Sequence, residues 1–248
     1  MRHSVLIAQL GAALEEAASA PAALSLQRFF TAPVAALGIS NQQVRTIASQ
    51  AVAKQPSLAT GDWLEIASHF AHSHAVHEHF ILASSLAAVL ARKIGDDQPF
   101  LGLMQAWLEQ DASNWAQCDD LCIKPLHVYL QSKPHRIKEI FAWGASGGAW
   151  CRRASNVALV KLVARSRHCD LAQVLANCER LLTDQDPYVQ KGVGWMLKVA
   201  VQREPHAVMP FLELHAGVMQ RSTLRYAVEK LPQAARCRLL HAATAPRL

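Results

Sequence analysis

Apolar residues recur along this chain at the spacing of amphipathic helices, and strand-like alternation is nearly absent. Segments of roughly 10 to 20 residues with this helical period are separated by short clusters of proline, glycine and serine. The clearest helix start is Asp186-Pro187, where an N-cap acid precedes a proline at the first helical position. Because helix follows helix through short connections, the sequence predicts an all-α fold.

The helix that starts at Asp186 predicts a core face and an unusual opposite face. A rotation of 100° per residue places five apolar residues on the core face: Val189, Val193, Met196, Leu197 and Ala200. Trp195 projects about 150° away from the centre of that face, between Lys191 and Lys198. We expect the ring to contact a base or sugar beside lysines that neutralise phosphates. The alternative is a tryptophan that packs against a neighbouring helix.

A second helix, predicted at 114–124, carries Trp115 and Asp119 one turn apart on its apolar side. Asp120 projects on the other side and is predicted to be a solvated surface acid. Pro125 is expected to end or kink the helix. Burying Asp119 costs free energy unless the carboxylate is paired. Asp119 is therefore either a functional carboxylate or a structural acid, held for example by Arg153.

A third helix, predicted at 148–165, places an arginine among apolar residues. Arg153 lies in line with Val157, Val160 and Ala164, and Arg152 lies about 100° round the helix. An inward arginine can hold a carboxylate or a phosphate through two hydrogen bonds. A buried Arg–Asp pair without a catalytic role is the alternative.

The spacing of these residues indicates a repeat. Arg153 follows Asp119 by 34 residues, and Trp195 follows Arg153 by 42. Helical-pair repeats have periods of about 35 to 47 residues, and equivalent positions in successive repeats line one face. The three residues are therefore predicted to share a concave face.

Three segments of the chain resemble the AlkD-like family of alkylpurine DNA glycosylases, which are built from HEAT-like repeats: 114–119, 150–154 and 189–197. The family carries a Trp with an Asp four residues later, an Arg three residues after another Trp, and a Trp in a Gln-Lys-x-x-Gly-Trp helix. These positions correspond here to Trp115, Asp119, Arg153 and Trp195. Leu37-Gly38-Ile39 and the following Val44-Arg45 also look like the family's N-terminal signature. The chain departs from the family at 30–34 and in the His-rich segment around His77-Glu78.

The length of 248 residues predicts a single domain over residues 1–248. The resemblance, which spans roughly residues 25 to 230, implies a HEAT-like α-solenoid with a concave DNA-binding face. It implies a base excision repair glycosylase that hydrolyses the N-glycosidic bond of 3-methyladenine and 7-methylguanine in duplex DNA. It assigns the catalytic role to four residues: Asp119, Trp115, Arg153 and Trp195. The residues expected to bind DNA are Lys191, Lys198, Arg152 and Arg45. The alternative is a non-catalytic HEAT-repeat module that binds DNA or another protein.

The expected chemistry needs no metal or organic cofactor. A purine alkylated at N3 or N7 carries positive charge and is already a good leaving group. A carboxylate such as Asp119 can stabilise the developing oxocarbenium and position a water molecule. Trp115 and Trp195 would shape the pocket, and Arg153 would hold a phosphate.

Composition adds little that is specific. Against 19 acidic residues the chain has 25 Lys and Arg, and its net charge of +6 suits a polyanion but equally an ordinary basic surface. Six cysteines without a CxxC pair indicate free thiols in a reducing cytoplasm.

Gln9 and Glu15-Glu16 interrupt a stretch similar to a signal peptide, so a first helix is predicted there. No apolar run approaches the ~18 residues of a membrane span. We expect a cytoplasmic monomer, nucleoid-associated when bound to duplex DNA, with no membrane partner.

Two further motifs are assigned to structure rather than to chemistry. The G-x-S-x-G match at 144–148 follows a helical segment, so a turn between helices is predicted in place of a nucleophile elbow. A hydrated, pH-sensitive helix end is predicted in place of a metal site for five histidines: His69, His72, His74, His77 and His79.

Overall fold

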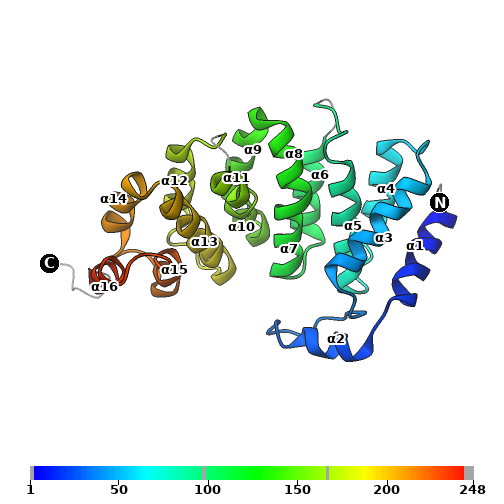
Figure 1. Cartoon of the computed structure of the whole chain (residues 1–248), viewed down its shortest axis with the longest axis horizontal. Coiled ribbons are helices and arrows are strands. Elements are labelled where there is room, and N and C mark those ends of the chain that lie inside the picture. The colour runs from blue at the N-terminus through cyan, green and yellow to red at the C-terminus, as the bar shows by residue number, and fades with distance from the viewer. Residues whose placement is uncertain (1–2, 97–98, 166–167, 243–248) are drawn as a thin grey trace. The chain divides into compact units, whose positions relative to one another are not determined.

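Every element of the computed structural model is helical within residues 3–96, 99–165 and 168–242, the ranges that the structure describes (Figure 1). The all-α prediction is confirmed. The chain forms two compact units, Met1–Tyr129 and Leu130–Leu248. The single domain over 1–248 stays a prediction. None of the helices within the described ranges is long and apolar enough to cross a membrane.

The first unit begins with the helix that was predicted at the N-terminus. Its elements are α1 (Ser4–Glu16), α2 (Ala20–Gln27), α3 (Asn41–Lys54), α4 (Thr60–Ala71), α5 (His77–Leu90), α6 (Phe100–Gln110), α7 (Trp115–Leu121), the π-helical turn η1 (Cys122–Leu126) and α8 (His127–Ser132), whose last residues belong to the second unit.

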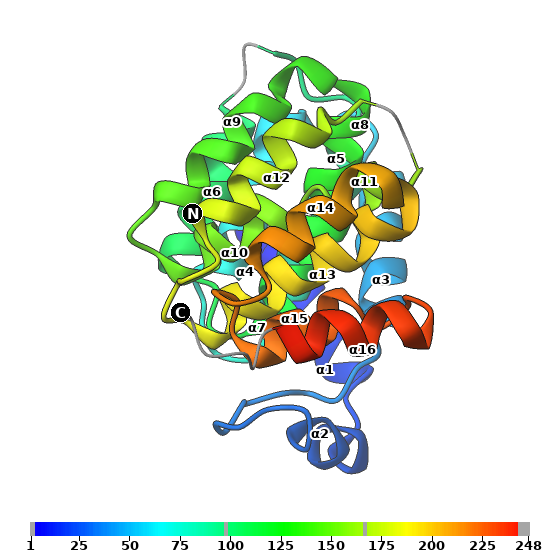
Figure 2. The ribbon, with the colours of Figure 1, turned by 90° about the vertical axis from the view of Figure 1, so that its left-hand side faces the viewer.

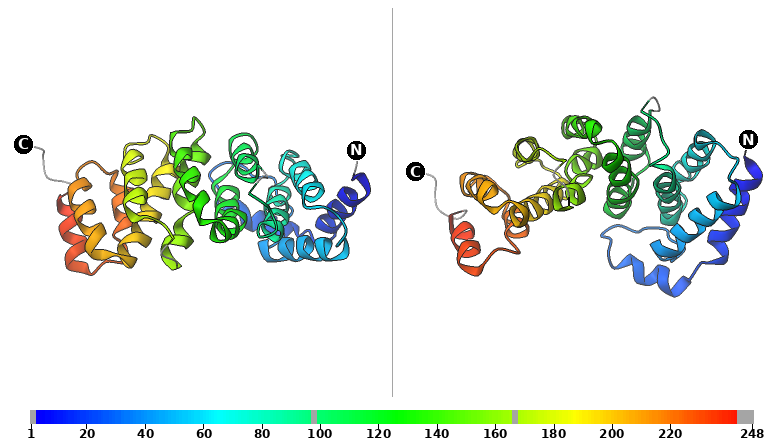
Figure 3. Two further views of the ribbon diagram at one scale, coloured as in Figure 1. Left: turned by 90° about the horizontal axis from the view of Figure 1, so that it is seen from above. Right: turned by 45° about the horizontal axis from the view of Figure 1, so that its top comes forward.

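Helix α5 is the central element of the first unit. It packs against α3, α4, α7 and η1, and each of its residues from Phe80 to Ala87 is buried. The three views of Figures 1 and 3 show α1, α3, α4 and α5 side by side. Trp63 of α4 and Trp107 of α6 are fully buried in this core. In Figures 1 and 2, α2 and the segment 28–40 lie to one side of these helices.

The chain continues as a helix through Pro125, so of the two predicted outcomes, an end or a kink, the end of the helix is wrong and the kink stays a prediction. Residues Cys122–Leu126 form one π-helical turn, and α8 follows directly. A π turn has a wider hydrogen-bonding ring, which accommodates one residue without an N–H group, and such turns are frequent at functional sites. Helix α7 and η1 therefore form one rod that extends from Trp115 past Lys124.

The second unit consists of further short helices. Its elements are η2 (Pro134–Arg136), α9 (Ile137–Ala142), η3 (Trp143–Ala145), α10 (Ala149–Val157), α11 (Val160–Arg165), α12 (Leu171–Arg180), α13 (Pro187–Arg203), α14 (Pro205–His215), α15 (Arg221–Ala227) and α16 (Gln233–Ala242). Figure 3 shows these helices in successive layers. Residues 144–148 connect η3 to α10, as a turn between helices was predicted to do.

Helix α13 is the central element of the second unit, and its sequence-based description is confirmed. Asp186 caps it by accepting hydrogen bonds from the backbone N–H groups of Tyr188 and Val189, at 2.8 and 3.1 Å. All five residues predicted for its core face are buried. The helix packs against α10, α11 and α15. A Cβ atom at Gly194 would lie 3.0 Å from the carbonyl oxygen of Thr223, so glycine permits the close approach of α15.

The single helix predicted at 148–165 is two helices, α10 and α11, separated by Ala158 and Leu159. Arg153 and Val157 are buried on α10, whereas Ala164 is exposed on α11. The apolar stripe predicted through Ala164 therefore does not continue to that residue. A rotation of 100° per residue holds only within one uninterrupted helix.

Candidate functional site

Trp115 and Asp119 lie one turn apart on α7. Asn114 caps this helix, because its side-chain oxygen accepts hydrogen bonds from the N–H groups of Ala116 and Gln117, both at 3.1 Å. Trp115 is the first helical residue and is partly exposed, whereas only 9% of Asp119 is exposed. The structure thus places a carboxylate in a largely water-excluded position beside an accessible aromatic ring.

Trp115 belongs to an aromatic cluster with Phe30 and His77. The Phe30 ring centroid lies 5.8 Å from each of the other two rings. Trp115 Nε1 also donates a hydrogen bond to the carbonyl oxygen of Phe29, at 3.4 Å. The segment 28–40, which departs from the family pattern at 30–34, therefore forms one wall of the Trp115 site.

His77 is buried, so the prediction of a hydrated helix end does not hold for this residue. Burial lowers the pKa of His77 below its ordinary value, although the charges of Glu78 and Asp120 act in the opposite direction. The imidazole beside Phe30 is therefore neutral at pH 7.

His72 and His74, in contrast, are about half exposed. Nδ1 of His72 lies 2.8 Å from the Asp111 carboxylate, and Nε2 of His74 lies 3.2 Å from it. The sequence did not indicate this acid partner.

Glu78 is fully buried and holds the segment before α3. Its carboxylate accepts hydrogen bonds from the backbone N–H groups of Leu37, Gly38 and Ile39, at 2.9, 2.8 and 3.1 Å. Gly38 has a φ of +78°, which favours glycine. Glu78 lies in the first turn of α5, where the helix dipole stabilises negative charge. In the sequence Glu78 stood out only as part of a departure from the family pattern, and its partner segment only through the resemblance of 37–39 to a family signature.

Asp120 is buried, so its prediction as a solvated surface acid is wrong. Its Oδ1 atom accepts a hydrogen bond from Nη2 of Arg45 at 2.6 Å, and its Oδ2 atom accepts one from Oγ of Ser84 at 2.7 Å. The side of α7 that seemed polar in the sequence thus packs on α3 and α5. Arg45, which was predicted to bind DNA, is 27% exposed and is held by this carboxylate.

In the second unit Arg153 is buried on α10 and contacts the first turns of α13. Its Nη1 atom donates a hydrogen bond to the carbonyl oxygen of Tyr188. A Cβ atom at Gly192 would lie 3.3 Å from Cγ of Arg153, so the glycine leaves space for the arginine side chain. The sequence predicted the inward direction of Arg153 correctly, but it did not predict the contact with α13.

Lys191, Trp195 and Lys198 follow one another along α13, one turn apart. Trp195 is partly exposed, in agreement with its predicted direction away from the core. The Lys191 ammonium lies 5.2 Å from the ring centroid of Tyr188. The Lys198 ammonium lies 3.9 Å from the ring centroid of Tyr226 and donates a hydrogen bond to Glu229 at 3.3 Å. Both lysines are therefore anchored over tyrosine rings beside Trp195.

Arg152 forms hydrogen bonds with two loops of the second unit, the one before α10 and the one before α13. Its Nε and Nη2 atoms donate hydrogen bonds to Asp184, at 2.6 and 3.3 Å, and Nη1 donates to the carbonyl oxygens of Ser146 and Gly147. Burial raises the pKa of Asp184, but the hydrogen bonds from Arg152 and from the N–H group of Asp186 outweigh it and hold the pKa below its ordinary value. These contacts give Arg152 a structural role, and its DNA contact stays a prediction.

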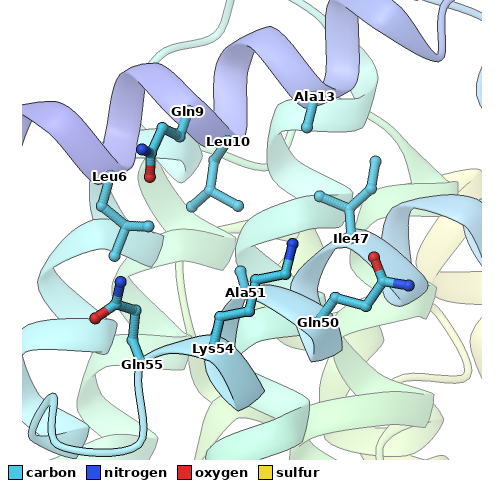
Figure 4. Close-up of a pocket in the computed structure, with 9 residues that line it drawn as sticks. All are labelled: Leu6, Gln9, Leu10, Ala13, Ile47, Gln50, Ala51, Lys54 and Gln55. Atoms are coloured by element: carbon cyan, nitrogen blue, oxygen red, sulfur yellow. The ribbon is translucent and has the colours of Figure 1, made fainter.

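Trp115 and Asp119 belong to the first unit, and Arg153 and Trp195 to the second. Their assembly into one site therefore stays a prediction. Among the described residues, the side chains spaced to hold a metal ion are those of His3, Asp62 and Glu65, near the start of the chain. A hollow of about 410 Å³ lies between α1 and α3 (Figure 4), and its lining contains amides, apolar residues and Lys54 but no carboxylate, histidine or cysteine.

Known structures share this fold. A predicted DNA alkylation repair enzyme from Enterococcus faecalis superposes with a TM-score of 0.76 at 14% sequence identity, covering 87% of this chain and 97% of that chain. AlkD2 from Streptococcus mutans gives a TM-score of 0.58 at 18% identity, covering 83% and 89%. The protein smu.31 from Streptococcus mutans UA159 gives 0.54 at 18% identity, covering 82% and 97%. These likenesses define the class as all-α proteins with the AlkD-like helical repeat fold.

Comparison of the sequence with models of protein families assigns this chain to a family. A family model described as DNA alkylation repair enzyme matches residues 10–231, which is most of the chain. The chain belongs to this DNA alkylation repair enzyme family. A comparison with curated proteins gave no match.

Proposed function

We propose that this protein is a DNA glycosylase that releases positively charged alkylated purines, such as 3-methyladenine and 7-methylguanine, from duplex DNA. The observation that carries the proposal is the pair formed by Trp115 and Asp119: a carboxylate only 9% exposed, one helical turn from a partly exposed tryptophan. Membership in a family of DNA alkylation repair enzymes supplies the substrate class. The protein acts as a cytoplasmic monomer without a metal or organic cofactor.

The proposed reaction is hydrolysis of the N-glycosidic bond. A cationic purine leaves as a neutral base with the bonding electron pair, and positive charge develops on the deoxyribose. The Asp119 carboxylate stabilises this charge and directs a water molecule to the sugar carbon, because a negative charge acts strongly where water is excluded. The water gives up a proton, and the products are a free purine and an abasic site.

The other residues that match the family pattern bind the substrate rather than take part in the proton transfer. The Trp115 ring, backed by Phe30, contacts the sugar or the backbone of the damaged nucleotide. In the second unit, Trp195 contacts DNA between Lys191 and Lys198, whose ammonium groups neutralise phosphates. Arg153 holds a phosphate through the charge-assisted hydrogen bonds typical of its guanidinium.

The direct test is base release from a duplex pretreated with a methylating agent. We expect free 3-methyladenine or 7-methylguanine in the supernatant and an equal number of abasic sites in the DNA. The same duplex without methylation is the control and should release nothing. Salt-dependent binding of the methylated duplex without any base release would instead indicate a non-catalytic DNA-binding protein.

A further inference from the structure

A further pocket lies in the first unit, between α3, α5 and the π-helical turn η1. It has a volume of about 290 Å³. Its nitrogen donors are the side chains of Gln42 and Arg45 on α3 and of Lys124 on η1, and Ala88 and Val89 of α5 form an apolar side. None of its described lining residues is a carboxylate.

The hydroxyl groups of the pocket are engaged within their own helices. Thr46 and Ser49 donate to the carbonyl oxygens of Gln42 and Thr46, both at 3.0 Å, and Ser85 donates to that of Ile81 at 2.6 Å. The donors that remain for a ligand are therefore nitrogen atoms, and two of the three side chains that carry them are cationic. Such a lining favours an anion.

Arg45 and Lys124 differ in how their charges are balanced. The Arg45 charge is opposed by the buried Asp120, which accepts one of its five N–H groups. Nε of Arg45 is buried without a hydrogen-bond partner. The side chain of Lys124 forms no hydrogen bond or ion pair with any residue in the described ranges. Lys124 therefore supplies the net positive charge of the pocket, and Arg45 supplies fixed donors.

We infer that this pocket binds one backbone phosphate of the DNA, between Lys124 and Arg45. The inference rests on the proposed function, which supplies duplex DNA as the ligand. One net charge near the surface is worth about 0 to 1 kcal/mol, too little to hold free phosphate. A duplex, in contrast, adds many such contacts at once. Lys124 follows Asp119 on the same helical rod by five residues, about 7 Å along its axis.

The site is tested by the salt dependence of duplex binding. Each phosphate contact adds about 0.9 to the slope of log K against log salt concentration. We expect Lys124→Gln to lower this slope by about 0.9, so that wild type loses about 3.5-fold more affinity than the variant between 50 and 200 mM salt. Lys93→Gln removes an exposed lysine after α5 that does not line the pocket, and its slope should equal that of wild type.

Equal slopes for wild type and Lys124→Gln would overturn the inference. Inorganic phosphate that binds wild type at millimolar concentration but not Lys124→Gln, with equal duplex slopes, would also overturn it by indicating a free-phosphate site. Circular dichroism and thermal unfolding show whether each variant is folded. If wild type binds duplex but releases no base, the glycosylase proposal fails, and the comparison of slopes still decides the phosphate site.

Discussion

The carboxylate of Glu78 and the backbone N–H group of Gly38 are joined by a hydrogen bond of 2.8 Å, 40 residues apart in the sequence. The same carboxylate holds Leu37 and Ile39. Because this segment also carries Phe30, which packs on Trp115, a fully buried acid outside the candidate site fixes one wall of it.

Replacing Glu78 tests this relationship. Glu78→Gln keeps the size of the side chain but removes the charge that accepts three backbone hydrogen bonds. Hydrogen bonds to charged groups contribute about 1.5 to 3 kcal/mol each, and the amide retains part of them, so we expect the free energy of unfolding to fall by about 2 to 4 kcal/mol. Urea denaturation measures the change. Glu16→Gln, at an exposed position of α1, is the matched control and should change stability by less than about 0.5 kcal/mol. Equal stability of the two variants would contradict the role of Glu78.

The stability of the second unit should fall in acid because of Asp184. Its pKa is held below the ordinary value of 3.8 in the folded state, so its contribution is complete above about pH 5 and is lost as the pH falls through the folded pKa. At pH 7 we expect Asp184→Asn to lower the free energy of unfolding by about 1.5 to 3 kcal/mol, because it breaks the hydrogen bonds with Arg152. Denaturation at several pH values should show that this difference shrinks below pH 4. A difference that stays constant down to pH 2 would exclude the carboxylate as its source.

His77 should add a second acid-sensitive contribution, in a higher pH range. Its folded pKa lies below 6.5, so the unfolded chain binds a proton more readily, and stability falls as the pH drops below 6.5 toward the folded pKa. Nuclear magnetic resonance of the histidine ring protons should give His77 a pKa below its ordinary value of 6.5. In His77→Gln the loss of stability between pH 7 and 5 should be smaller than in wild type. A His77 pKa at or above 6.5 would contradict the burial argument.

Replacing Gly192 with alanine should not stabilise the protein, because Arg153 occupies the space beside this glycine. Alanine in place of an exposed helical glycine stabilises a protein by about 0.5 to 1 kcal/mol. A Cβ atom at Gly102 in α6 meets no atom within 4 Å, so we expect Gly102→Ala to show this gain. In Gly192→Ala the contact with Cγ of Arg153 at 3.3 Å should cancel the gain, and base release should decrease as the arginine shifts. An equal gain in both variants, with unchanged base release, would show that Arg153 moves freely.

The hydrophobic periodicity of the sequence was sufficient to predict features that depend on a single helix. The N-cap at Asp186, the core face of α13 and the outward direction of Trp195 follow from rotation about a single axis, and the structure confirms them. The all-α fold follows in the same way from the sum of such helices. The inward direction of Arg153 was also predictable, because α10 is uninterrupted between Ala149 and Val157.

The errors concern residues whose environment comes from distant segments. Asp120 seemed solvated because its face of α7 is polar, but Arg45 and Ser84 lie 75 and 36 residues earlier in the chain. Glu78 was overlooked because its partners are backbone groups, which leave no pattern in side-chain types. The break at Ala158 and Leu159 lacks glycine and proline, so no local signal marked it. Tertiary contacts outweighed local preference at each of these positions.

The central claim is that Asp119 is the catalytic carboxylate. Single-turnover release of methylated base from a methylated duplex, with enzyme in excess, compares wild type with Asp119→Asn. Asp170→Asn is the matched control, because it removes the same charge while asparagine still caps α12. We predict that Asp119→Asn lowers the rate at least 100-fold, while both variants bind the duplex and Asp170→Asn releases base at the wild-type rate. Base release by Asp119→Asn at the wild-type rate would contradict the claim.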